Sequence, residues 1–287
     1  MKKILLKFLG LLSLVKVQNV MALLLAQFIM AHIIYCPKCQ ILKLLLNQKF
    51  ILFLFSTATA ISAGYIINNF YNLKRDLINR PAKTGLEQQI QTNKKLYLYF
   101  ALNFLSVISG LFISWRAALF FSFFIFLIWI YSHKLQHKAL IHEMANVLLI
   151  LFPFFGIMLF FKQVNSFLIL TGILVAFILF IKELIKNFLT LPGDFAQQIE
   201  TVLTRYGEKK LNILFYISLL SAYFVSTALY LQTKETRFPF FIILLWIILG
   251  IIMALFKKKK YFQAYQIIKL LIVSGIFSLY LLKLNVT

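Results

Sequence analysis

The sequence predicts an all-α membrane protein with about nine transmembrane helices. Apolar residues make up 62% of its 287 residues and charged residues only 13%, whereas a soluble domain has roughly 45–50% apolar and about 25% charged residues. The apolar residues also gather in long runs, such as 148–161 and 238–256, and a helix needs about 20 mostly apolar residues to cross a bilayer. Composition and arrangement together therefore place most of the chain in lipid.

The long apolar runs are expected to form helices rather than barrel strands. In lipid, the backbone groups of a spanning segment must bond one another, which leaves only helices and closed barrels. Barrel strands alternate between apolar and polar residues at every second position, and these runs show no such alternation.

Residues 1–16 are expected to form an amphipathic lead-in that lies on the membrane surface. The segment is basic and only weakly apolar. Lys7 and Lys16 interrupt the apolar core that a signal peptide requires, and no small-residue cleavage site follows. This pattern favours a surface helix over a cleaved signal peptide.

Nine spans are expected after this lead-in, and no linker rich in Pro, Gly or Ser separates them. We therefore expect residues 1–287 to form a single domain. The spans lie near residues 18–35, 50–69, 96–114, 117–132, 144–161, 165–181, 211–231, 239–256 and 264–282.

The 30 Lys and Arg residues predict the orientation of these spans. If the N-terminus lies inside, 21 of them fall on inner segments and 8 on outer segments, while Lys269 lies within the last span. Because short cytoplasmic loops carry an excess of Lys and Arg, we expect a multi-pass protein of a bacterial inner membrane with a cytoplasmic N-terminus. The two long polar loops, 70–95 and 182–210, then face the cytoplasm.

The net charge of +22 is expected to serve the membrane rather than a nucleic acid. In a chain this apolar, Lys and Arg orient loops and contact anionic lipid headgroups. Membrane lipids are therefore expected partners, nucleic acid is not, and a protein partner is left open.

The carboxylates are few, and both aspartates of the chain follow the end of a predicted span. Each aspartate is preceded by polar residues seven and four positions earlier. Offsets of three and seven fall on one helical face, and repeats of this kind in membrane proteins often meet around a shared site. Ordinary polar residues at helix ends would explain the spacing equally well. The two triplets are Asn69, Asn72 and Asp76, and Asn187, Thr190 and Asp194.

Four stretches around these triplets resemble motifs of the UbiA superfamily of intramembrane prenyltransferases. Residues 64–81 resemble its first Asp-rich motif, usually N-D-x-x-D-x-x-x-D followed by x-x-N-R-P, and residues 182–194 resemble the second, usually R-E-x-x-K-D-x-x-D-x-x-G-D. Residues 130–135 resemble its Y-S-x-x-L-K element, and residues 16–19 resemble the R-x-x-N at the start of its first helix. The resemblance runs in order over nearly the whole chain and is nearest to members that act on geranylgeranylglyceryl phosphate.

The resemblance implies a helical bundle around a central cavity that opens sideways to lipid. A prenyl diphosphate would bind there with Mg²⁺ held by the two Asp-rich motifs, and its prenyl group would pass to an acceptor. By the same resemblance, Asp76, Asp194 and Tyr131 are expected to be catalytic. The implied substrate-binding residues are Asn19, Asn68, Asn69, Asn72, Lys74, Arg75, Arg80, Lys182, Lys186 and Asn187. The implied metal ligands are Asp76, Asp194, Asn69, Asn72 and Asn187.

The sequence departs from this family pattern at the acidic positions. Asn and Thr replace four motif carboxylates, Leu189 replaces a fifth acidic position, and Gln136 stands where the Y-S-x-x-L-K element has Lys. Magnesium prefers oxygen ligands and usually takes one or two carboxylates, so we expect its binding to be weakened or lost. The four replaced carboxylates are at Asn69, Asn72, Asn187 and Thr190.

The basic residues around the motifs remain, which leaves three functions open. The first is prenyl transfer with weakened Mg²⁺ binding. The second is binding of a polyprenyl phosphate or another anionic lipid without catalysis, because Arg and Lys bind phosphate directly. The third is a subunit of a membrane complex.

Two clusters resemble metal sites, and for each we favour the plainer interpretation. Cys36 and Cys39 form a C-x-x-C pair one turn after His32, but a zinc site normally needs four ligands, so a structural turn is preferred. The second cluster is expected to be a loop near the lipid headgroups, with zinc as a weaker alternative. Its members are His133, His137, His142 and Glu143.

Overall fold

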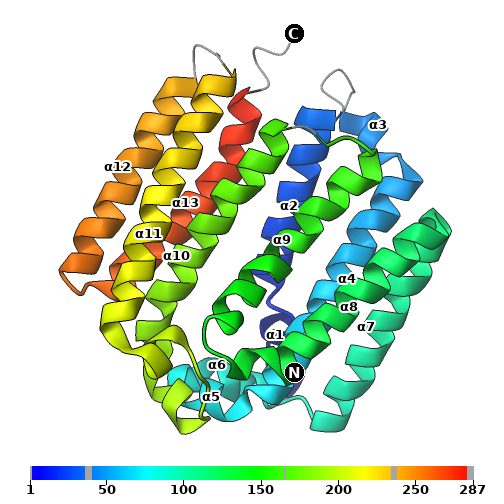
Figure 1. The fold of residues 1–287 in the computed structure, drawn as a ribbon. Helices are drawn as coiled ribbons and strands as arrows, with labels where there is room; N and C mark the ends of the chain where they lie inside the picture. Colours follow the sequence, from blue (N-terminus) through cyan, green and yellow to red (C-terminus); the bar gives the residue numbers. More distant parts are fainter. Residues whose placement is uncertain (1, 36–40, 165, 234–237, 283–287) are drawn as a thin grey trace. The chain divides into compact units, whose positions relative to one another are not determined.

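A computed structural model describes residues 2–35, 41–164, 166–233 and 238–282, and these residues form helices without a β-strand (Figure 1). Cys36 and Cys39 lie outside the described residues, so the prediction of a turn there has no structural counterpart. The first helices are α1 (Lys2–Leu14), α2 (Val17–Met30), the π-helix η1 (Ala31–Tyr35), α3 (Ile41–Leu45), α4 (Gln48–Tyr71), α5 (Leu73–Asn79) and α6 (Pro81–Glu87). They are followed by α7 (Thr92–Ile113), α8 (Trp115–His133), the 3₁₀ turn η2 (Leu135–His137), α9 (Ile141–Phe161), α10 (Ser166–Ala196), α11 (Val202–Thr233), α12 (Phe238–Lys257) and α13 (Tyr261–Leu282).

The structure supports a multi-pass membrane protein, with seven described helices long and apolar enough to span a bilayer. An eighth span results if α1 and α2 are counted together, since they form a pair bent by 49°. The apolar part of α13, Tyr261–Phe277, is shorter. All nine predicted spans overlap helices, but the count of nine spans is not confirmed. The seven helices are α4, α7, α8, α9, α10, α11 and α12.

The chain divides into two compact units, which we describe separately. The first unit comprises Met1–Phe28, Lys38–His137 and Pro192–Ile199. The second comprises Ile29–Pro37, Lys138–Leu191 and Glu200–Thr287.

Helices α4, α7 and α8 form the centre of the first unit. Small hydroxyl residues lie where α4 meets α7, and the hydroxyls of Ser56 and Ser109 are 2.7 Å apart. Ser106 donates to the backbone carbonyl of Ser56 at 2.8 Å. Small side chains of this kind let helices in a membrane approach closely, and hydrogen bonds then hold them together.

Aromatic stacking organises the core of the second unit. The rings of Phe215 on α11 and Phe256 on α12 stack with centroids 3.9 Å apart. Phe188 on α10 stacks on Tyr261 of α13 at the same distance. Phe188 also meets Phe256 edge-on, with centroids 5.8 Å apart. Four helices are therefore joined around one aromatic cluster.

Helix α10 corrects one expectation from the sequence. We predicted a polar loop over 182–210, but α10 continues to Ala196 and α11 begins at Val202. The reason is that Ile181, Leu184 and Ile185 continue a helically spaced apolar face, and all three are fully buried in the core of the second unit. The second motif is thus carried on a helix.

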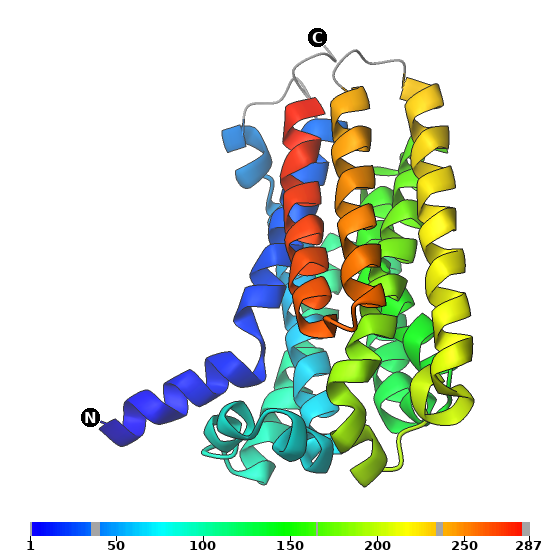
Figure 2. The same cartoon turned by 90° about the vertical axis from the view of Figure 1, so that its left-hand side faces the viewer.

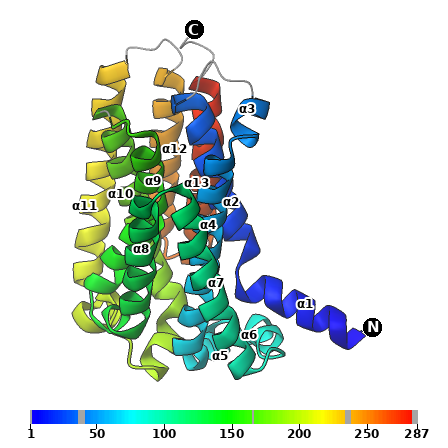
Figure 3. The ribbon, with the colours of Figure 1, turned by 90° about the vertical axis from the view of Figure 1, so that its right-hand side faces the viewer.

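Helix α1 is helical as expected and packs against α6 within the first unit. Leu5, Phe8 and Leu9 remain exposed on it, which agrees with the predicted surface position, although that position stays a prediction. Figures 2 and 3 show α1 running away from α4 with its inner end near α6. The two helices approach closely at Gly10, where an added Cβ would lie 2.5 Å from the carbonyl oxygen of Leu86.

Replacing Gly10 with Ala is therefore expected to push α1 away from α6. The added Cβ meets a backbone oxygen that cannot rotate away, so the cost should be about 1–3 kcal/mol. Thermal unfolding in detergent, together with limited proteolysis of α1, measures the effect. Gly275→Ala is the matched control because nothing lies within 4 Å of that added Cβ. Equal behaviour of the two variants would contradict the close contact.

Candidate functional site

Asn69, at a position where the resembled motif has Asp, is buried in a network that includes a glutamate. Its amide nitrogen donates to Oε2 of Glu87 at 2.8 Å, and its Oδ1 accepts from Nζ of Lys95 at 3.1 Å. The other oxygen of Glu87 accepts from the hydroxyl of Ser13 on α1 at 2.8 Å. Asn69 thus lies between a cation and a carboxylate, and the network joins α1, α4, α6 and α7.

Asn72 lies at the junction between α4 and α5, with φ −102° and ψ 18°. The first triplet is therefore split by a break between two helices, which differs from the continuous face predicted for it. The amide nitrogen of Asn72 donates to Oε1 of Gln136 at 2.8 Å. Both side chains are almost fully buried, and Oδ1 of Asn72 has no hydrogen-bond partner among the described residues. Two amides therefore meet where the resembled motifs have Asp and Lys.

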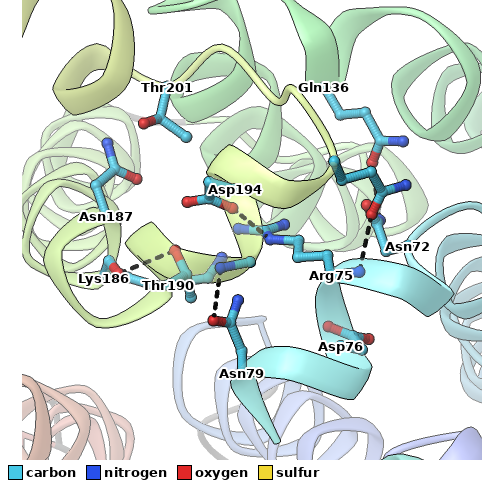
Figure 4. A network of polar contacts seen from close by, with 12 residues as sticks. Asn72, Arg75, Asp76, Asn79, Gln136, Lys186, Asn187, Thr190, Asp194 and Thr201 are labelled. Atoms are coloured by element: carbon cyan, nitrogen blue, oxygen red, sulfur yellow. Dashed lines mark hydrogen bonds and ion pairs between the residues drawn. The ribbon is translucent and has the colours of Figure 1, made fainter.

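A buried ion pair joins the two motifs within the first unit (Figure 4). Nε of Arg75 on α5 lies 2.5 Å from Oδ1 of Asp194 near the end of α10, and the side chains are 9% and 0% exposed. Residues 119 positions apart in the sequence are thus held together. Removing one partner of an ion pair this buried strongly destabilises the protein, because the other charge stays buried and uncompensated.

Backbone contacts support this ion pair. The N–H of Gly193 donates to Oδ1 of Asn79 at 3.1 Å. Gln197 accepts from the N–H of Arg75 at 3.1 Å and donates to the carbonyl of Tyr71 at 2.5 Å. The end of α10 is therefore fixed to α5 by side chains on both sides of Asp194.

Asp76 on α5 is held separately, by Arg80 and by Thr84 on α6. Its carboxylate forms an ion pair with Arg80, one helical turn later, and its backbone carbonyl accepts from the hydroxyl of Thr84 at 3.0 Å. Asp76 is 6% exposed, whereas about a third of the Arg80 side chain is exposed. Each surviving motif aspartate is therefore paired with an arginine of the first motif.

In the second unit, Asn187 on α10 is bound to a buried glutamate of α9. Its amide nitrogen donates to Oε1 of Glu143 at 2.7 Å. The same oxygen accepts from the backbone N–H of Val202 at 2.8 Å. Val202 is the first residue of α11, so Glu143 connects three helices.

The lysines of the second motif are paired on their own helix. Glu183 is 2% exposed, and its two oxygens lie 3.3 Å from Nζ of Lys182 and 2.7 Å from Nζ of Lys186. Thr190 donates to the backbone carbonyl of Lys186 at 3.2 Å, which Figure 4 also shows. The hydroxyl of Thr190 is thus used within its helix.

The remaining predicted site residues differ in exposure. Asn19 is exposed and donates to the hydroxyl of Tyr65 at 3.3 Å. Tyr131 is buried at 7% exposure. Lys74 is exposed and Asn68 is partly buried. No contact in the first unit ties Lys74 to Asp76 or Asp194 among those seen in the described part of the chain, so its role stays a prediction.

The histidine cluster does not form the loop that we expected. His142 and Glu143 are buried on α9, whereas His133 ends α8 with its ring stacked on Trp129 at 5.4 Å. Within the described residues, no three His, Cys, Asp or Glu side chains are placed to hold a metal ion.

The same observation bears on the Mg²⁺ implied by the sequence resemblance. In the part of the chain that the structure describes, Asp76 and Asp194 are each neutralised by an arginine, and the other motif positions offer neutral groups. Mg²⁺ is usually held by one or two carboxylates with substrate phosphates. As arranged, these side chains do not form a magnesium site.

Sequence reasoning missed Glu87 and Gln197 as motif partners and recognised Glu143 only as a possible zinc ligand. A signal was present, because the chain has only eight acidic residues. A carboxylate next to a membrane span is costly unless it is paired. Glu87 and Glu143 therefore required partners, although the sequence could not say which.

Fold and site together define a multi-pass membrane protein whose two polar motifs lie at the ends of membrane helices. Residues 40–273 match the UbiA prenyltransferase family. Because the match covers most of the chain, the protein belongs to this family, as the motifs predicted.

Two archaeal relatives share part of the sequence. The digeranylgeranylglyceryl phosphate synthase of Methanosphaera stadtmanae is 27% identical over 190 residues, which cover 64% of this chain and 67% of that protein. The synthase of the same name from Korarchaeum cryptofilum is 26% identical over 156 residues. This second match covers 54% of the chain and only 55% of the Korarchaeum protein.

Solved structures share the fold over nearly the whole chain. A structure concerned with digeranylgeranylglyceryl phosphate synthase in membranes aligns with a TM-score of 0.69 at 20% identity, covering 99% of this chain and 97% of that one. A UbiA homolog from Archaeoglobus fulgidus bound to DMAPP and Mg²⁺ has a TM-score of 0.67 at 14% identity, covering 94% and 98%. A UbiA homolog from Aeropyrum pernix K1 has a TM-score of 0.70 at 12% identity, covering 92% and 98%. At these identities the likeness shows the fold alone.

Gly193→Ala is expected to separate the end of α10 from α5. An added Cβ would lie 2.4 Å from Nδ2 of Asn79 and 2.7 Å from the carbonyl oxygen of Arg75. The shift would stretch the ion pair with Asp194, so we expect a loss of more than about 1 kcal/mol, measured as a lower midpoint of thermal unfolding in detergent. Gly85→Ala is the matched control, because it adds a Cβ to open space at a helical position where Ala is favoured. A Gly193→Ala midpoint equal to that of the control would refute the contact.

Proposed function

We propose that this protein transfers a prenyl group from a prenyl diphosphate to a hydroxyl of an isoprenoid glyceryl phosphate or a similar acceptor, with little dependence on Mg²⁺. Family membership supports the transfer, and the names of the two archaeal relatives support the acceptor class. The observation that carries the proposal is the pairing of Asp194 and Asp76 with Arg75 and Arg80. This pairing occupies both motif carboxylates with arginines, so the proposed phosphate contacts are guanidinium N–H groups rather than a metal ion held by the aspartates.

In the proposed reaction, the allylic C–O bond of the donor breaks and diphosphate leaves with the electron pair. The acceptor oxygen forms a new C–O bond to the prenyl carbon and loses its proton to the released diphosphate or to water. The main requirement is stabilisation of charge on the leaving diphosphate. A guanidinium has five N–H donors and matches phosphate geometry, so Arg75 and Arg80 are proposed to meet this requirement.

The other predicted roles remain part of the proposal. Asp76 and Asp194 orient the two arginines, and Tyr131 stays a candidate near the reacting group. Lys182, Lys186 and Lys74 stay candidates for phosphate binding. The predicted cytoplasmic position of the motifs in a bacterial inner membrane rests on the bias of Lys and Arg toward inner segments. A single functional domain over 1–287 also stays a proposal.

A second candidate function is binding of a polyprenyl phosphate without catalysis. Neutral amides at Asn69, Asn72 and Asn187 favour it, because they remove charges that would otherwise repel a phosphate. This candidate shares the donor-binding residues with the first. The two differ in whether a product forms.

Geranylgeranyl diphosphate is expected to stabilise the purified protein equally with Mg²⁺ and with a chelator. A ligand that binds only the folded state raises the unfolding midpoint by mass action, and the proposed binding groups are cations of the protein itself. Thermal unfolding in detergent measures the shift. Stabilisation that disappears with chelator would contradict the proposed metal-poor site.

Product formation separates the two candidates. The same samples are incubated with geranylgeranylglyceryl phosphate and analysed by mass spectrometry for an adduct one geranylgeranyl group heavier. We expect the adduct. Ligand stabilisation without any adduct would instead support the binding function.

Arg80→Ala is expected to weaken geranylgeranyl diphosphate binding by roughly ten- to a hundredfold, since a hydrogen bond to a charged group contributes about 1.5–3 kcal/mol. The apparent Kd from thermal shifts measures this loss. Arg116→Ala is the matched control, because Arg116 is exposed on α8, beside the Trp115 ring and away from the motifs. A loss of equal size in both variants would show that only the overall charge matters.

A further inference from the structure

Basic residues gather on the surface of the second unit, where two segments far apart in the sequence meet. One segment, 205–210, lies at the start of α11, and the other, 257–260, forms the turn from α12 to α13. They are joined where Nζ of Lys259 lies 3.9 Å from Oε1 of Glu208. Every residue of both segments is exposed. We call the Lys and Arg residues of these two segments the basic cluster.

The basic cluster has more positive charge than the neighbouring carboxylates neutralise. Two of its seven cations are paired, Arg205 with Glu200 and Lys259 with Glu208. The other five form no ion pair with a carboxylate in the described part of the chain, which leaves an excess of cations facing outward. These five are Lys209, Lys210, Lys257, Lys258 and Lys260.

The turn that carries residues 257–260 is fixed to the core of the second unit. The N–H of Lys259 donates to the carbonyl of Phe256 at 2.9 Å. Phe256 is buried and stacks on Phe215, and Tyr261, which follows the turn, stacks on another ring of the same core. The backbone of the turn is therefore preorganised, so a ligand has to order only the lysine side chains.

The basic cluster lies where the headgroups of a bilayer are expected. The apolar span of α12 is Pro239–Lys257, so the lysines of the turn follow its last apolar residues directly. Phe262, just after the turn, is largely exposed, as a side chain that faces lipid would be. A cluster of about four to eight Lys and Arg residues beside a spanning helix is typical of sites that bind anionic lipid headgroups.

An orientation signal alone would not require two segments. The run 257–260 would orient α12 by its charge wherever the start of α11 lay. The structure holds 205–210 against this run, and a break at Gly207, with φ +78°, shapes the start of α11. After the break, Nζ of Lys210 lies 5.0 Å from the centroid of the Tyr206 ring. Two separate groups of lysines are thus presented together.

We propose that the basic cluster binds a phospholipid whose headgroup carries two phosphates, as cardiolipin does. Lys209 and Lys210 bind one phosphate, and the unpaired lysines of the turn bind the other. Once the first phosphate is bound, the second is held at a high effective concentration, so this lipid binds more tightly than one with a single phosphate. The site does not depend on the proposed prenyl transfer.

Thermal unfolding of the full chain in detergent tests the choice of lipid. Cardiolipin, phosphatidylglycerol and phosphatidylcholine are added at equal phosphate concentration, since a ligand of the folded state raises the unfolding midpoint. We expect the largest rise with cardiolipin, a smaller one with phosphatidylglycerol and the smallest with phosphatidylcholine. Equal rises with cardiolipin and phosphatidylglycerol would overturn the assignment to two phosphates.

Two double variants test whether the basic cluster is the site. The first is Lys209→Gln with Lys210→Gln, and the second is Lys257→Gln with Lys258→Gln. All four lysines are exposed, so the midpoint without lipid should change little. We expect the apparent Kd for cardiolipin to rise roughly ten- to thirtyfold in each variant, the effect of two lysines near a membrane surface.

Lys43→Gln with Lys49→Gln is the matched control. It removes two exposed lysines from α3 and α4 of the first unit, so the change in net charge is the same. We expect the Kd for cardiolipin to stay within about twofold of the unaltered protein, because a single charge pair outside the site contributes little when salt screens it. Equal losses in the control and in the cluster variants would show that only net charge matters and would overturn the site.

Inorganic diphosphate provides the last comparison, since it carries two phosphates without acyl chains. We expect it to raise the midpoint much less than cardiolipin at the same concentration, because it is not held at the membrane end of α12. Stabilisation equal to that by cardiolipin would assign the basic cluster to a free phosphate ligand and overturn the assignment to a lipid.

Discussion

The buried ion pair between Arg75 and Asp194 is the interaction on which the arrangement of the first motif depends. It joins α5 to the end of α10 across 119 residues of sequence. Gly193 and Gln197 reinforce it through hydrogen bonds to the same short helix. A buried charge pair contributes little net stability compared with an apolar contact. Replacing one partner is nevertheless costly, because it leaves the other charge buried and unpaired. Its value here is in specifying one docking geometry for the motif.

The same pair contributes to holding the first motif together without four of the motif carboxylates. The basic side chains of the first motif would repel one another if every acid were replaced. The two aspartates that remain each neutralise one arginine. The amides at the other positions are bound by Glu87, Gln136 and Glu143. The replaced positions are thus hydrogen-bonded into the protein rather than left unpaired.

Much of the fold could be predicted from the sequence, because long apolar runs have few alternatives in lipid. The helices at all nine predicted spans and the family follow from those runs and from the motifs. The extent of α10 could not be predicted, because Lys182, Glu183 and Lys186 made an amphipathic helical turn look like a polar loop. The partners of the amides could not be predicted either, because Glu87 and Glu143 lie 18 and 44 residues from the asparagines that they bind. Long-range pairs of this kind depend on packing that no local pattern encodes.

The contact between α1 and α6 has a consequence for the order in which the chain assembles. Ser13 and Glu87 are separated by 74 residues, so α1 leaves the ribosome well before the helix that it binds exists. During this interval its exposed Leu5, Phe8 and Leu9 would suit an amphipathic helix that lies on the bilayer. Once α6 is present, the hydroxyl of Ser13 donates to one oxygen of Glu87, whose other oxygen accepts from Asn69. This contact therefore forms only after α6 has been synthesised, although α1 precedes it in the chain.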